Sequence, residues 1–164
     1  MRVRAADESD VDAIRDVVEA SWEIDYPAIL SRERADEGVD EWYAPDGLHE
    51  AVDDGRTVLL VAEREESSQG RSVVGFVHGL LDGDVGHVLR IYVHPEHREA
   101  EVGTTLFEEG REALVDRGAE RVRAMVLAEN TPGNEFYRSL GLERVDEGET
   151  TIGGESYTEN VYEA

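Results

Sequence analysis

The sequence predicts a mixed α/β fold of the α+β kind, in which a central sheet of about seven strands carries helices on both faces. Runs rich in β-branched residues alternate with segments whose apolar residues recur at helical spacing. Tight polar turns separate the central runs, and no internal repeat or linker interrupts the chain. We therefore expect one domain over residues 1–164, with the element order β-α-α-β-β-β-α-β-α-β-β.

The N-terminal part is expected to hold a short edge strand followed by helices. Residues 2–4 alternate polar and apolar side chains, and Asp7–Asp10 supplies N-cap groups for the helix that follows. Apolar residues then recur with a helical period until Trp22. A second helix is expected at 29–37 and a short one at 48–54.

The middle of the chain predicts three strands joined by two turns. Residues 57–63 and 72–81 are apolar, β-rich runs, and the polar segment 65–71 between them makes a hairpin. An Asp-Gly turn at 82–84 leads into a third strand that ends at Val93.

That third strand and the helix after it are the organising feature of the sequence. Pro95 stops the strand because proline donates no ladder hydrogen bond, and helical spacing begins at Glu101 and runs to about Asp116. Gly118 is expected to cap this helix. A helix that starts just after a strand presents backbone N–H groups and a positive dipole end, which suit an anion such as a pyrophosphate.

The C-terminal part completes the sheet. Residues 121–128 alternate as a strand, and a helix is expected from Thr131 to about Leu140, with proline in its first turn. The last two strands are expected at 142–146 and 157–162, on either side of a glycine-rich turn. We place that turn at Gly148 to Gly154.

The charge of the chain is its most unusual property. There are 39 acidic residues against 16 basic ones, a net charge of −23, and every basic residue is arginine. The acids are spread along the chain, which indicates a solvated surface typical of proteins from a salty cytoplasm, so we expect a halophilic archaeal source. In molar salt the Debye length is about 3 Å, which screens such self-repulsion. The same charge argues against nucleic acid as a partner.

Other classes are disfavoured by composition. The chain has no cysteine, so disulfide and thiolate chemistry are excluded and a cytoplasmic location is expected. No apolar run approaches the roughly 20 residues of a membrane span, and no signal-peptide pattern opens the sequence. We expect no membrane partner and no metal site.

Two segments carry a family resemblance. They are Tyr92-Val93-His94-Pro95-Glu96-His97-Arg98 followed by Gly103, and Asn130-x-x-Gly133-x-x-Phe136-Tyr137-x-x-x-Gly141-Leu142. In this order and spacing they resemble the GNAT N-acetyltransferases, whose acetyl-CoA motif is Gln/Arg-x-x-Gly-x-Gly/Ala and whose second segment is Asn…Phe-Tyr…Gly-Phe. The likeness extends loosely over almost the whole chain and implies the GNAT fold. Glu101 departs from it, because it stands where the motif has its first glycine.

The resemblance implies acetyl-CoA as the co-substrate. The backbone at Ile91–Val93 would pair with the pantetheine arm and offer an N–H to the carbonyl oxygen, and the amides of Arg98–Thr104 would cradle the pyrophosphate. The residues expected at the cofactor are Ile91, Tyr92, Val93, Arg98, Glu99, Ala100, Glu101, Val102, Gly103, Thr104, Asn130 and Tyr137. Glu101 either repels a phosphate, or points to solvent as a stabilising acid in the first helical turn.

The resemblance also implies catalytic residues. Tyr137 is the expected general acid, since a phenol stays protonated at neutral pH; the alternative is a tyrosine that only packs against Phe136. Asn130 either bonds the pantetheine or only caps the helix. Counted back from the motif, His87 stands where some members carry a catalytic glutamate, so it is either the base or a strand-end bystander, with His78 as the fallback.

The acceptor is expected to be an amine of a small molecule or a peptide. Trp22, Tyr26, Trp42 and Tyr43 are candidates for its pocket, although aromatic residues more often serve as packing, and His78 is a further candidate. We expect an acetyl-CoA-dependent N-acetyltransferase, an acyltransferase that works by direct attack in a ternary complex. The alternative is a non-catalytic GNAT-fold module that binds acyl-CoA or a partner protein. Dimers are common in the family, so a homodimer is a candidate assembly.

Overall fold

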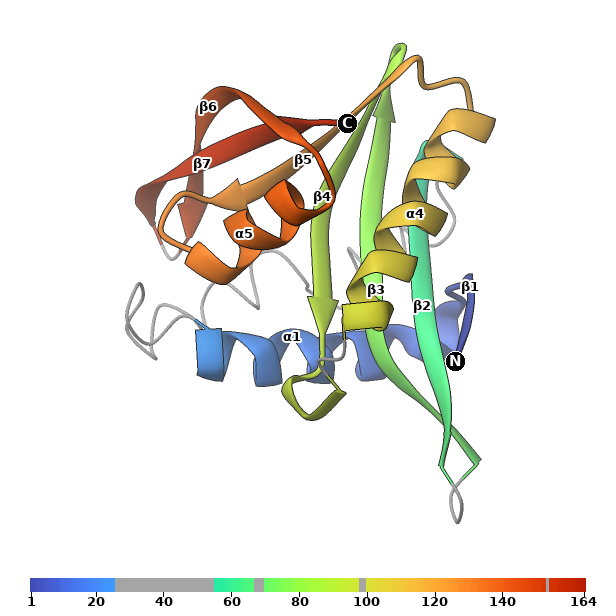
Figure 1. The fold of residues 1–164 in the computed structure, drawn as a ribbon. Coiled ribbons are helices and arrows are strands. Elements are labelled where there is room, and N and C mark those ends of the chain that lie inside the picture. The colour runs from blue at the N-terminus through green and yellow to red at the C-terminus, as the bar shows by residue number, and fades with distance from the viewer. Residues whose placement is uncertain (26–54, 67–69, 98–99, 153) are drawn as a thin grey trace.

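The computed structural model describes residues 1–25, 55–66, 70–97, 100–152 and 154–164 (Figure 1). The helices expected at 29–37 and 48–54 lie outside these ranges. The described elements follow one another as β1 Arg2–Ala5, η1 Glu8–Asp10, α1 Val11–Asp25, β2 Thr57–Glu66, β3 Gly70–Asp82, β4 Val85–Val93, η2 Pro95–His97, α4 Ala100–Asp116, β5 Arg121–Leu127, α5 Thr131–Ser139, β6 Glu143–Ile152 and β7 Glu155–Glu163.

The predicted mixed sheet is confirmed. Seven strands join in the order β1-β2-β3-β4-β5-β7-β6. Neighbours pair antiparallel, with the exception of β4 and β5, which are parallel because the chain crosses back through α4 between them. The two parallel strands therefore form the junction between the two halves of the sheet.

Helices cover both faces of the sheet, as expected, and each face has its own apolar core. On one face Ile14 and Val18 of α1 pack with Phe76 and Tyr92. On the other face α4 and α5 pack on the sheet, with Leu106 and Leu114 of α4 fully buried there. Figure 1 shows α1 crossing behind the strands while α4 lies along their front. The sheet is thus the middle layer of three.

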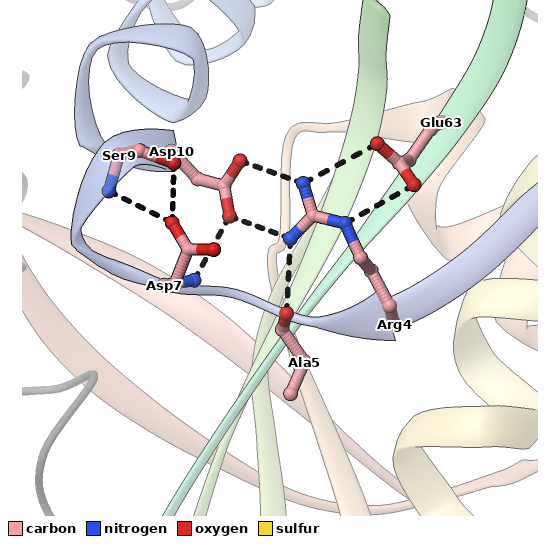
Figure 2. A network of polar contacts seen from close by, with 6 residues as sticks. All are labelled: Arg4, Ala5, Asp7, Ser9, Asp10 and Glu63. Carbon is pink, nitrogen blue, oxygen red and sulfur yellow. Dashed lines mark hydrogen bonds and ion pairs between the residues drawn. The ribbon is translucent and has the colours of Figure 1, made fainter. Parts of the chain in front are cut away.

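The N-terminal elements are tied together by a charged network (Figure 2). Arg4 of β1 makes a two-pronged contact with Asp10, at 2.7 and 2.9 Å, and also reaches Glu63 of β2 at 3.1 Å. Asp7 is the N-cap of η1, and its side chain accepts a hydrogen bond from the Ser9 amide while Asp10 accepts one from the Asp7 amide. The N-cap chemistry expected at Asp7–Asp10 is confirmed, and it fixes the start of α1 against the sheet edge.

The end of the chain differs from the prediction. The glycine-rich segment predicted as a turn is mostly strand: Gly148 pairs with Glu159, and β6 continues to Ile152. Strand β7 begins at Glu155, and Gly154 just before it has a φ of +82°. The composition of this segment suggested a turn, but pairing with β7 satisfies its backbone, and tertiary context overrides local preference in strands. The strand expected at 57–63 also runs longer, to Glu66.

Candidate functional site

The sheet opens between its two parallel strands. Pairing of β4 with β5 runs from Val85–Arg121 to Val88–Ala124, although β4 continues to Val93 and β5 to Leu127. Figure 1 shows the two strands diverging beyond this point. The register of β4 against β3 shifts there as well, since Gly79 pairs with Val88 and His78 with Arg90, which leaves Leu89 as an extra residue. A bulge bends its strand and increases the local twist, so the bulge at Leu89 accounts for the opening.

Two backbone features of the opening suit acetyl-CoA. Within the described strands, the edge of β4 that faces β5 has no strand partner from Leu89 to Val93, and an extended amide-bearing chain would lie along this edge. Helix α4 begins at Ala100, shortly after β4 ends, and its first turn carries N–H groups without intrahelical partners. These features fit a pantetheine arm and a pyrophosphate, respectively. Arg98 and Glu99 lie outside the described residues.

The first turn of α4 shows how exposed the Glu101 side chain is. Its side chain is exposed, while the next residue, Val102, is buried in the core beneath the helix. Gly103 serves packing here: a Cβ at this position would come within 3.1 Å of the Phe136 ring, so the glycine lets α4 approach α5. Thr104 is half-buried on the same turn. The arrangement matches the expectation in which Glu101 points to solvent.

Tyr137 lies between the two helices of the front face and the sheet. It is only 4% exposed, and its ring makes edge contacts with Phe107 of α4 and Phe136, at centroid distances of 6.1 and 5.3 Å. Burial raises the pKa of the Tyr137 phenol above its ordinary value; Arg90 acts to lower this pKa, whereas Glu159 acts to raise it. Tyr137 therefore carries its proton at neutral pH, as a general acid must.

Two asparagines hold α5 in place. Asn130 is the N-cap of α5, and its side chain accepts a hydrogen bond from the Gly133 amide at 3.1 Å, so capping is the described role of its side chain. Asn134, one turn later, donates to the carbonyls of Leu127 and Asn130 at 3.0 and 2.7 Å. Its Oδ1 accepts from the Tyr162 hydroxyl of β7 at 2.7 Å. This network ties the end of β5, α5 and β7 together, and so fixes the position of Tyr137.

A charged cluster that sequence reasoning missed lies at the opening. Arg90 of β4 and Glu159 of β7 approach to 3.4 Å, and their side chains are only 16% and 13% exposed. His78 of β3 pairs with Arg90 across the sheet, and its pKa is lowered to about 4, first by burial and then by the Arg90 charge. We call His78, Arg90 and Glu159 the opening cluster. Of the three, sequence analysis named His78 alone.

His87 lies in the closed part of the sheet instead. It pairs with Arg123 of β5 and Leu80 of β3, before the point where the strands part. Burial lowers the pKa of His87; Asp82 acts to raise it and Arg123 to lower it further. Its Nδ1 is enclosed with no hydrogen-bond partner in the described part of the chain. The structure thus brings His78 to the opening, next to Arg90, and places His87 in the paired part of β4.

Several other predicted residues are beyond what the structure describes. The side chain of Trp22, and the residues Tyr26, Trp42 and Tyr43, lie outside the described residues, so the acceptor pocket expected from them stays a prediction. Of the three β4 residues expected at the cofactor, Tyr92 is buried against Phe76, whereas Ile91 and Val93 are half-buried on the α4 face. Among the described helices, none is long and apolar enough to cross a membrane.

Comparisons with known proteins agree with this geometry. The profile of the acetyltransferase (GNAT) family matches residues 12–142. A spermidine N(1)-acetyltransferase of Thermoplasma acidophilum is 23% identical over the whole chain and 99% of its own length. A mycothiol acetyltransferase of Thermobifida fusca is 36% identical over 62% of the chain, which corresponds to 30% of that longer protein.

Solved structures show the same fold. The crystal structure of the PaiA N-acetyltransferase of Thermoplasma acidophilum, in complex with coenzyme A, superposes with a TM-score of 0.81 at 23% identity and covers 96% of both chains. An aminoglycoside 6'-acetyltransferase type Ii superposes with a TM-score of 0.69 at 15% identity, over 100% of this chain and 96% of that one. At these identities the likeness speaks for the fold alone.

Proposed function

We propose a function on one premise, which the profile match establishes: this chain belongs to the acetyltransferase (GNAT) family. It transfers an acetyl group from acetyl-CoA to a primary amine, by direct attack of the amine while both substrates are bound. The observation that carries this proposal is the opening between β4 and β5, where a bulged strand edge, a helix start and the protonated Tyr137 converge.

Acetyl-CoA supplies the thioester carbonyl that the amine attacks and the thiolate that departs. The backbone of Ile91–Val93 holds the pantetheine arm as an added strand would, and an N–H from this edge points to the carbonyl oxygen. The amides at the start of α4, from Ala100 to Thr104, hold the pyrophosphate with Arg98 and Glu99 before them. Tyr137 gives its proton to the sulfur, since the same burial that keeps it neutral keeps water from it.

Two histidines near the opening are candidates for the general base in this proposal. His87 was expected from the sequence and remains a candidate, which His87→Ala tests directly. His87 lies where β4 still pairs with β5, so residues 89–93 of β4 separate it from the end of the opening next to α4. His78 lies nearer the Arg90 end, and its pKa of about 4 keeps its imidazole neutral at pH 7. A neutral imidazole can accept a proton, although at this pKa it is a weak acceptor.

The acceptor class follows from the family and from the relatives. Those relatives are named for spermidine and mycothiol, and a further one, a thialysine N-epsilon-acetyltransferase of Bos taurus, is 30% identical over 49% of the chain. We infer a small amine as the acceptor, with a peptide amine as the second choice. The acceptor enters from the α1 face, where the opening cluster lies.

The test separates binding from chemistry. Acetyl-CoA is titrated calorimetrically into the protein in about 2–3 M KCl, and release of CoA thiol is then followed with spermidine, thialysine, amino acids and a peptide amine. Binding together with thiol release for at least one amine supports the proposal. Binding without release for any amine supports the non-catalytic acyl-CoA-binding module instead, and absence of binding at low and high salt contradicts both.

We also propose that the protein works in a salt-rich cytoplasm and folds as one domain over residues 1–164. The support is the net charge of −23 without any lysine, together with the single sheet that both halves of the chain share. Thermal unfolding should show one transition whose midpoint rises steadily from 0.1 M to molar KCl. A midpoint that falls with salt would contradict the proposed environment, and two separate transitions would contradict the single domain.

A further inference from the structure

We infer that Glu159 is the carboxylate that binds the acceptor's ammonium group and takes its proton, and that Arg90 positions it. This inference rests on the proposed acetyl transfer and names the residue that selects a cationic amine. It starts from the ion pair between these two side chains, which links β4 to β7 near the end of β5.

The position of Glu159 on β7 places it at the opening. Its backbone partner on β5 is Leu127, the last residue of that strand, and its partner on β6 is Gly148, which has no side chain to cover it. The side chain of Glu159 is on the face of β7 that is turned toward α1. On the same face, Tyr157 of the α1-side core precedes it and the buried Val161 follows it. Burial of a carboxylate whose side chain is only 13% exposed costs desolvation free energy, so its presence calls for a partner or a ligand.

The partner that the structure provides contacts Glu159 loosely. Arg90 Nη1 is 3.4 Å from Glu159 Oε2, longer than the 2.7–2.9 Å typical of a charge-assisted hydrogen bond. Among the described residues, Arg90 is the one hydrogen-bonding partner of the Glu159 carboxylate. The second carboxylate oxygen of Glu159 can accept further hydrogen bonds, and an ammonium group supplies three N–H donors.

The opening cluster and Tyr137 act on the same space from opposite faces of the sheet. Tyr137 approaches from the α5 side, and the charges of Arg90 and Glu159 both influence its pKa. Arg90 contacts Glu159, and Tyr137 interacts electrostatically with Arg90, Tyr92 and Glu159, while His78 interacts with Arg90. His78 is neutral at pH 7, so Glu159 is the anion of this group, and an incoming ammonium is drawn to it.

The proton balance of the transfer follows from these positions. The ammonium gives one proton to the Glu159 carboxylate, which later passes it to water. The neutral nitrogen then forms a bond to the carbonyl carbon as the carbon–sulfur bond breaks, and the electron pair of that bond goes to sulfur. Tyr137 gives its proton to the sulfur and is reprotonated by the second proton that the nitrogen loses. The sum is one amide, one thiol and one proton released.

The same strand offers a matched control. Glu163 lies four residues further along β7, on the same face of the strand. It forms ion pairs with Arg123 at 3.2 Å and Arg121 at 3.9 Å. It pairs across the sheet with Arg123, in the closed part where β4 and β5 are still joined. Glu163 thus shares the residue type, strand and arginine partner of Glu159, and differs in its distance from the opening.

The experiment compares Glu159→Gln with Glu163→Gln in thiol release with n-butylamine and spermidine, beside calorimetric titration of acetyl-CoA. We expect Glu159→Gln to lower kcat/KM at pH 7 about a hundredfold, as loss of a general base does, while acetyl-CoA affinity stays within about twofold. Glu163→Gln should stay within about twofold in both measurements. Unchanged acetyl-CoA binding shows that Glu159→Gln is folded.

The pH profile distinguishes a proton acceptor from a structural residue. Above the pKa of the amine the acceptor is already neutral, so the deficit of Glu159→Gln should shrink as pH rises, and it should also shrink at pH 7 with trifluoroethylamine, a weakly basic amine. A deficit that is independent of pH and of amine basicity, or no deficit at all, overturns the inference. If the wild type releases no thiol with any amine, the proposed function itself fails, which is a separate outcome.

Discussion

Two arginine–carboxylate groups on the same sheet differ in how closely they are bonded. At the sheet edge, Arg4 contacts Asp10 at 2.7 and 2.9 Å and Glu63 at 3.1 Å, so two carboxylates hold one guanidinium (Figure 2). At the opening, Arg90 meets Glu159 through one contact of 3.4 Å. Both groups are largely buried, yet Arg4 and Asp10 make short, two-pronged contacts, whereas the described contact between Arg90 and Glu159 is single and longer.

The difference separates a structural role from a functional one. Short, two-pronged contacts fix β1, η1 and β2 together, and the hydrogen bonds with Asp10 and Glu63 raise the pKa of Arg4 above its ordinary value. The loose pair lies where the strands part, beside Tyr137 and His78. A substrate can enter a loose pair without breaking a strong interaction. We therefore assign stability to the Arg4 group and acceptor chemistry to the opening cluster.

Tyr137→Phe should have the largest effect, and this effect should be on the rate of acetyl transfer and not on acetyl-CoA binding. Phenylalanine keeps the ring contacts with Phe107 and Phe136 but removes the proton that the thiolate needs. We expect thiol release to fall at least about a hundredfold, equivalent to roughly 2.7 kcal/mol in the barrier, with acetyl-CoA affinity little changed. Steady-state kinetics beside calorimetry measures both. Activity within a few-fold of the wild type would leave Tyr137 as a packing residue only.

Arg4→Gln should lower the stability of the fold and leave the rate of acetyl transfer unchanged. The change removes the guanidinium that contacts Asp10 and Glu63, whose side chains are only 6% and 11% exposed. We expect the free energy of unfolding to fall by about 2–3 kcal/mol and the melting temperature by roughly 5–10 °C. Chemical denaturation followed by circular dichroism gives the value. A loss of less than about 0.5 kcal/mol would show that the short contacts contribute little.

Asp10→Asn tests the stabilising role of the Arg4–Asp10 contact through the pH dependence of stability. The hydrogen bond from Arg4 is the main cause that lowers the pKa of Asp10, against the opposing effect of burial. A carboxyl group whose folded pKa is lowered adds stability above its unfolded pKa of about 4 and loses it as pH falls through the folded value. We expect the free energy of unfolding of the wild type to exceed that of Asp10→Asn by about 1–2 kcal/mol at pH 7, and this difference to vanish towards pH 2. An advantage that persists at low pH would contradict the assignment.

Glu101→Gly should have the smallest effect. The side chain is exposed at the start of α4, so water and salt screen it from a bound pyrophosphate. We expect acetyl-CoA to bind up to about fivefold more tightly to the variant in low salt, a difference of about 1 kcal/mol, and equally well in molar KCl. Calorimetry in both buffers measures this. Binding that appears only in the variant, at any salt, would mean that Glu101 blocks the phosphate site.

Much of the fold could be predicted because local patterns and tertiary structure agree. The strand that ends at Val93, the helix after it and the capping residue Asp7 all depend on neighbours close in sequence. The last hairpin could not be placed in the same way: the long-range pairing of Gly148 with Glu159 decides it, and glycine content alone suggested a turn.

The candidate site was predictable in part for the same reason. Tyr137 and the β4–α4 connection carry motif residues, so the sequence indicated them. Glu159 came from no motif, and the fold brings it beside Arg90 from a strand at the far end of the chain. A signal was present nevertheless: Arg90 interrupts an apolar strand, and Glu159 stands between Tyr157 and Val161 on one face of its strand. Charges at buried strand positions mark sites that packing alone does not explain.

The most direct test gives both arginines the same substitution in one assay. Thiol release with n-butylamine is measured for Arg90→Gln and Arg4→Gln, at a temperature where circular dichroism shows both to be folded. We predict that Arg90→Gln lowers kcat/KM more than about tenfold, because Glu159 loses its orientation, while Arg4→Gln stays within about twofold of the wild type. Equal losses in the two variants, or a larger loss in Arg4→Gln, would contradict the division of roles between the two groups.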